Sequence, residues 1–86
     1  MTTPTIHGNG TSAQDLADGY AAAYSAIGAA IEAVAKTGPN GRDYYPQGPD
    51  VFHRATMEHR ARQTALSNVA EELMELAIYC GDMVKK

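Results

Sequence analysis

The 86-residue sequence has little of several residue types, with one cysteine (Cys80), one phenylalanine and no tryptophan. A single cysteine excludes an intramolecular disulfide and a zinc site built from several cysteines. No apolar run reaches the roughly 20 residues that a membrane-spanning helix needs. The first ten residues lack a basic start followed by an apolar segment, so we expect no signal peptide and a cytoplasmic protein.

Charge is also modest, since charged residues make up 20% of the chain and the net charge is −3. An acidic chain with a pI near 5.4 does not favour general binding to DNA or RNA. The 44% of hydrophobic residues is ordinary for a folded domain. At this length we expect one domain spanning 1–86, with no membrane association, metal or cofactor.

The chain divides into a polar segment (1–11), an alanine-rich segment (12–36), a segment rich in glycine and proline (37–49) and a second long segment (50–84). Large apolar residues recur at steps of three or four in both long segments, which predicts two helices. They are Leu16, Tyr20, Tyr24, Ile27, Ile31 and Val34 in the first and Leu66, Val69, Leu73, Leu76, Cys80 and Met83 in the second.

Thr11 with Gln14, or Ser12 with Asp15, provides a capping box for the first helix. The two helices would be roughly 37 and 50 Å long. Joined by 37–49, they form an all-α antiparallel hairpin. A lone hairpin of this size leaves much apolar surface exposed, so we expect it to assemble into a homo-oligomeric helical bundle.

Basic residues gather in one part of the chain. All four arginines and two of the three histidines fall between residues 42 and 62: Arg42, His53, Arg54, His59, Arg60 and Arg62. Arginine suits bidentate binding of phosphate, which makes Arg42, Arg60 and Arg62 candidate phosphate ligands and His59 a candidate polar wall. Alternatively, these charges are solvated or pair at a spacing of four, as Arg54 and Arg62 can with Glu58.

Two other polar segments supply candidate ligand-binding residues. Tyr44 and Tyr45 offer rings on which a base can stack, and Gln47 adds a donor for a base edge. The alternative is that the two tyrosines close the end of the hairpin core.

The segment His7-Gly-Asn-Gly-Thr-Ser12 opens directly into the first helix. His7, Asn9, Thr11 and Ser12 could therefore bind ribose or phosphate beside free helix amides. Alternatively, Thr11 and Ser12 only cap the helix. This segment and the loop 37–49 would lie at opposite ends of one hairpin. A shared ligand would thus require a second protomer, and we expect the site at a subunit interface.

Three strings, Thr5-Ile-His-Gly-Asn-Gly-Thr-Ser12, Pro39-Asn-Gly-Arg-Asp-Tyr-Tyr-Pro-Gln-Gly48 and His59-Arg-Ala-Arg62, resemble a family of small helical-hairpin proteins encoded by phages and prophages. In size and layout the chain is also similar to phage anti-defence sponges. The resemblance implies a small oligomeric protein that traps a cyclic oligonucleotide or cyclic ADP-ribose messenger of bacterial immunity between protomers.

The leading hypothesis is therefore a binding protein that sequesters a small phosphorylated nucleotide without turnover. The alternative is a protein–protein inhibitor or structural phage protein without a nucleotide ligand, with Glu71, Glu72, Glu75 and Asp82 marking the contact. We do not expect an enzyme, because the sequence contains no recognisable arrangement of a nucleophile with a general base. His53 and His59 are also six residues apart, which does not place them on one helix face.

Overall fold

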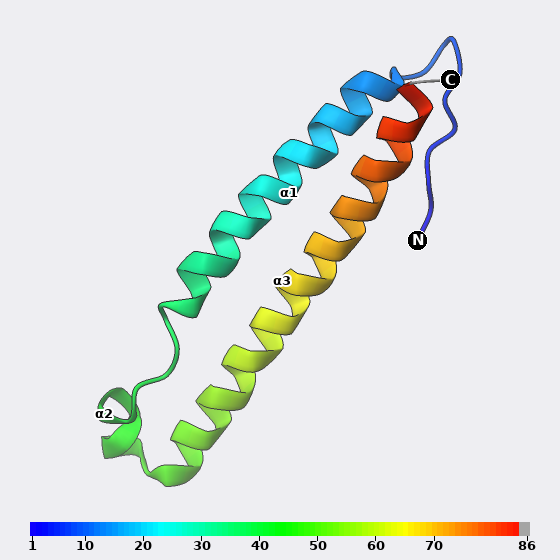
Figure 1. The fold of residues 1–86 in the computed structure, drawn as a ribbon. Helices are drawn as coiled ribbons and strands as arrows, with labels where there is room; N and C mark the ends of the chain where they lie inside the picture. The colour runs from blue at the N-terminus through cyan, green and yellow to red at the C-terminus, as the bar shows by residue number, and fades with distance from the viewer. Residues whose placement is uncertain (85–86) are drawn as a thin grey trace.

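The computed structural model describes residues 1–84, and these residues form helices and connecting segments without a strand (Figure 1). The elements are α1 (Ala13–Ala35), α2 (Gly41–Tyr44), a 3-10 turn (Tyr45–Gln47) and α3 (Pro49–Val84). The prediction of an all-helical protein is confirmed, and the long helices match the predicted segments to within one residue. Lys85 and Lys86, expected to complement the carboxyl end of the second helix, lie outside the described residues.

The ends of α1 follow from its flanking residues. The Ser12 side chain accepts a hydrogen bond from the Asp15 amide at 3.0 Å, so Ser12 is the capping residue. At the other end the Thr37 hydroxyl donates to the Val34 carbonyl at 2.7 Å. Gly38 and Pro39 follow and stop the helix.

The segment 37–49 contains more structure than a simple loop. The Asn40 side chain accepts a hydrogen bond from the Arg42 amide at 2.9 Å and caps the single turn of α2. Gly48 then adopts φ 101°, a conformation that favours glycine, and Pro49 begins α3. The glycine and proline residues of 37–49 predicted a segment without a long helix. The sequence did not reveal the short helix, because one helical turn has no apolar periodicity to detect.

The two long helices pack side by side in opposite directions (Figure 1). The molecule measures 60 × 20 × 17 Å, and the core between the helices is thin. Among residues 1–84 only Ala13, His59 and Cys80 are buried. No helix in this part of the chain is both long and apolar enough to cross a membrane.

The long helices differ in length, with 23 residues in α1 and 36 in α3. At 1.5 Å per residue, α3 is longer by about 20 Å. The start of α1 and the end of α3 lie at the same end of the molecule (Figure 1). The first turns of α3 therefore extend past α1, where the linker 36–40 and α2 accompany them.

Candidate functional site

A cleft of about 240 Å³ lies where α3 extends past α1. Its walls come from the linker after α1, from α2 and from the first half of α3. The lining residues are Thr37, Pro39, Tyr44, Val51, Arg54, Ala55, Glu58, His59 and Arg62. Three residues predicted as ligand-binding, Tyr44, His59 and Arg62, thus come together in one cleft.

The charged wall of the cleft is a row on α3. Arg54, Glu58 and Arg62 follow one another at steps of four, so their side chains project from the same face of the helix. Neighbours in such a row have Cβ atoms about 5–6 Å apart. Glu58 therefore occupies the middle position of the row between two arginines, and the row has one net positive charge.

His59 forms the inner wall and is the one buried polar residue among residues 1–84, with 8% of its surface exposed. It packs beside the linker. A Cβ added at Gly38 would lie 3.7 Å from the imidazole Nε2, in ordinary van der Waals contact. The linker at Gly38 therefore runs directly beside the imidazole.

The two adjacent tyrosines separate. Tyr44 is half-buried and packs against Phe52, with ring centroids 6.4 Å apart and an angle of 40° between the planes. Tyr45 is 84% exposed. It borders a different, mostly apolar hollow of about 400 Å³, formed with Gly41, Gly48, Pro49 and Phe52. Only Tyr44 can present its ring to the cleft.

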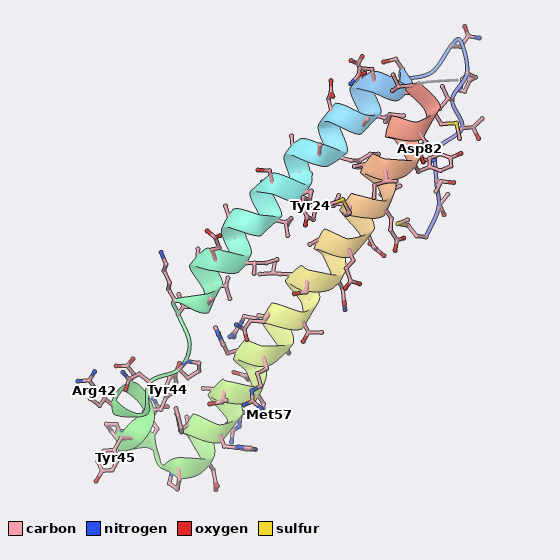
Figure 2. The ribbon with its side chains drawn as sticks, viewed as in Figure 1. Tyr24, Arg42, Tyr44, Tyr45, Met57 and Asp82 are labelled. Carbon is pink, nitrogen blue, oxygen red and sulfur yellow. The ribbon has the colours of Figure 1, made fainter. Side chains whose placement is uncertain are left out.

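Four further predicted residues do not line this cleft. Arg42 projects from the outer side of α2 (Figure 2). Tyr45 begins the 3-10 turn and borders the hollow that it shares with Pro49 and Phe52. Gln47 is exposed in the 3-10 turn. Arg60 is exposed on α3, and a separation of two residues turns it about 160° from Arg62. Within one chain, the fold therefore does not bring these four residues together with Arg62 in the cleft.

The amino-terminal candidates lie at the far end of the molecule, where α1 begins (Figure 1). The His7 Nδ1 accepts a hydrogen bond from the Asn9 amide at 3.3 Å, and the His7 carbonyl accepts one from the Gly10 amide at 3.1 Å. Ser12 caps α1, and Thr11 is exposed beside it. Within one chain these residues do not meet the cleft, as the predicted hairpin geometry required.

Arg54 lines the cleft but was not among the predicted site residues. The spacing of four, which places Arg54, Glu58 and Arg62 on one helix face, could have identified it. In the sequence analysis this spacing was interpreted only as charge pairing with Glu58. Among residues 1–84, no three histidine, cysteine, aspartate or glutamate side chains are placed to hold a metal ion.

Comparisons of the chain with protein-family models, with curated proteins and with solved structures find no match. The class of protein is therefore defined by the molecule itself: a small helical protein with two long helices and a cleft of mixed charge where the longer one extends past the shorter.

Proposed function

We propose that the protein is a binding protein that sequesters a small phosphorylated nucleotide, of the cyclic oligonucleotide or cyclic ADP-ribose type, without turnover. The observation that carries the proposal is the cleft, in which Arg54 and Arg62 lie beside His59 and the ring of Tyr44. Guanidinium groups bind phosphate through short, charge-assisted hydrogen bonds. Tyr44 supplies a face on which a base can stack, worth about 1–3 kcal/mol.

The size of the cleft supports a shared site. Pockets that enclose a small molecule usually measure about 300–1,000 Å³, whereas this cleft measures about 240 Å³. One chain thus has room for part of a dinucleotide. In this proposal a second copy covers the remainder with its amino-terminal end, where His7, Asn9, Thr11 and Ser12 lie. The protein would act as a homo-oligomer with an inter-subunit pocket.

The biological setting is part of the same proposal. The protein would act in the cytoplasm of a bacterial host and remove an immune second messenger on behalf of a phage. The support for this setting is the resemblance of the three sequence strings to phage-encoded hairpin proteins and of the layout to anti-defence sponges.

Native mass spectrometry tests the proposal with a panel of cyclic dinucleotides, cyclic trinucleotides and cyclic ADP-ribose isomers. We expect a mass shift of one ligand per fixed number of subunits, and intact ligand after denaturation of the protein. Release of a cleaved ligand would indicate an enzyme instead. If no compound of the panel shifted the mass of the protein, the proposal would be wrong, and a protein target would be the alternative.

Two substitutions assign the binding to the cleft. Arg62→Ala and Tyr44→Ala each remove a lining side chain, and we expect either to weaken binding at least about tenfold while the oligomer persists. Arg42→Ala is the matched control, because it removes an arginine from the outer side of α2 (Figure 2). If the control lost as much affinity as Arg62→Ala, the ligand would bind outside the cleft.

A further inference from the structure

A stripe of exposed side chains runs along α3 on a side of the helix that the cleft does not use. Successive members are three or four residues apart, so they share one face. They are Met57, Arg60, Thr64, Ser67, Glu71, Met74 and Ile78. Three of them are large and apolar, and Met57 and Ile78 are 52% and 55% exposed. The stripe therefore offers a second helix one continuous face of mixed apolar and charged side chains.

The stripe is complementary to itself when read in opposite directions. About the midpoint between residues 65 and 66, Arg60 is placed symmetrically to Glu71, and Met57 to Met74. We propose that a second copy of the chain packs antiparallel against this stripe, around a two-fold axis at that midpoint. Arg60 then faces Glu71 of the second copy, and the same pair forms twice. A parallel arrangement would instead oppose like charges, which is destabilising.

The side chains nearest the proposed axis are small. Thr64 and Ser67 flank the midpoint and are exposed. Two helices approach each other more closely where the side chains at their crossing are small. The stripe thus combines a close crossing at its centre with charged and apolar contacts towards both ends, which is the order that an isologous interface requires.

A groove beside the stripe could receive an apolar side chain of the second copy. It has a volume of about 300 Å³ and is lined by Tyr24, Ala70, Glu71, Met74 and Glu75. Tyr24 lies between the two long helices, and Met57 projects from the side of α3 turned away from α1 (Figure 2). In the antiparallel register Met57 of the second copy lies at the level of Met74. An unbranched thioether fills irregular gaps and makes favourable contacts with aromatic rings.

The surface area of the chain agrees with a dimer. Its accessible surface is 6259 Å². A globular monomer of 9.2 kDa would expose about 4,900 Å². The excess of about 1,300 Å² exceeds the roughly 800 Å² that each partner covers in a standard interface. A second copy on the stripe would bring the exposed area per chain towards that of a compact protein.

This inference depends on the surface of α3 and not on whether the cleft binds a nucleotide. Arg54, Glu58 and Arg62 point to another side of the helix, so the contact between the two copies of α3 does not bury them. The antiparallel arrangement also brings the amino-terminal end of the second copy to the end of the dimer that holds the cleft. The proposed inter-subunit site needs such an arrangement.

Charge reversal tests the interface by sedimentation velocity, with circular dichroism as the measure of folding. We expect a dimer for the unchanged chain. Arg60→Glu or Glu71→Arg alone places like charges opposite each other in both symmetry-related pairs. Either variant should raise the dissociation constant of the dimer at least about tenfold. The double variant Arg60→Glu with Glu71→Arg restores the pairs and the dimer. Glu72→Arg, an equal charge change one residue off the stripe, should keep it.

An unchanged chain that stays monomeric at submillimolar concentration would overturn the inference. So would a double variant that dimerises no better than its two parents. Binding of a nucleotide by the cleft is measured separately by mass shift, so it can hold even if this interface does not form. A monomeric chain that binds the ligand would remove only the inter-subunit part of the proposed function.

Cross-linking tests the register without weakening the fold. A mixture of two single variants, Arg60→Cys and Glu71→Cys, should form a disulfide-linked heterodimer on mild oxidation. Neither variant alone should cross-link, because the equivalent residues of the two copies would be offset by about 16 Å along the axis. A disulfide needs Cα atoms within about 7 Å. Cross-linking of either variant with itself would show a different register.

Discussion

The two halves of α3 have different roles although they belong to one continuous helix. The half around Cys80 lies against α1, and Cys80 is fully buried with 0% exposure. The half around His59 passes the end of α1 and lies beside the linker and α2. The difference teaches that unequal helix lengths can create a site. Where α1 stops, α3 no longer meets an apolar partner, and polar side chains occupy the same face.

The two halves of α3 should also differ in whether removal of a side chain lowers the stability of the protein or its affinity for a ligand. Around Cys80 the side chains exclude water from a thin core, so they should determine stability. Around His59 the face is charged, partly open and shaped by a short capped helix. There the side chains should determine what the protein binds. Three substitutions separate these expectations.

The largest effect is expected from Cys80→Asp. A carboxylate at this position would lie in the apolar contact between α1 and α3 without a partner. Burial of an unpaired charge costs several kcal/mol. We expect the free energy of unfolding, measured by urea titration with circular dichroism, to fall by more than about 3 kcal/mol. Since the core is thin, the variant should lose most of its helix content at ambient temperature.

Asn68→Asp is the control for this experiment. It introduces the same carboxylate at an exposed position of α3 and should change the free energy of unfolding by less than about 0.5 kcal/mol. If both variants unfolded equally, acidic charge on α3 would be the cause and the contrast between the halves would be lost.

The sequence predicted the Cys80 half well, and the reason is its periodicity. Apolar residues at steps of three and four placed Cys80 and Leu73 on one face, and the breakers after Ala35 placed the end of the shorter helix. The apolar pattern repeats many times along each long helix, so one residue that departs from it does not change the prediction of a helix. The short helix α2 has no repeat. Its first turn is capped by the Asn40 side chain, which accepts a hydrogen bond from the Arg42 amide, and residue spacing does not reveal such a cap.

The cleft was predicted in part. Tyr44, His59 and Arg62 were identified, whereas Arg54 was considered only as a partner of a glutamate. Arg60, which was predicted together with Arg62, does not line the cleft, since residues two apart face nearly opposite sides of a helix. The separation of Tyr44 from its neighbour depends on packing against α3, which only the tertiary structure determines.

An intermediate effect is expected from Glu58→Gln. Glu58 lines the cleft between Arg54 and Arg62 along the row, and its negative charge opposes an anionic ligand there. Its neutralisation raises the net positive charge of the row by one. Because Glu58 is exposed and solvent screens its field, we expect only about twofold to fivefold tighter binding of inorganic pyrophosphate at low salt. Isothermal titration calorimetry measures it.

Glu72→Gln provides the matched control, since it makes the same change on the other half of α3 and far from the cleft. It should leave pyrophosphate binding within error of the unchanged chain. Equal gains from both variants would mean that the whole negative charge of the protein, rather than the row of the cleft, opposes the anion.

The smallest effect on stability is expected from His59→Leu, although His59 is as deeply placed in its half as any residue there. A buried polar group contributes little net stability, and an apolar residue of similar size in its place can be neutral or stabilising. We expect the free energy of unfolding to change by less than about 1 kcal/mol in either direction. Loss of nucleotide binding in the same variant would assign His59 to the ligand. A fall in stability of more than about 2 kcal/mol would instead show that the imidazole holds the linker at Gly38 against α3. In that case both halves of the helix would contribute to stability, and the cleft would be a consequence of how the linker is anchored.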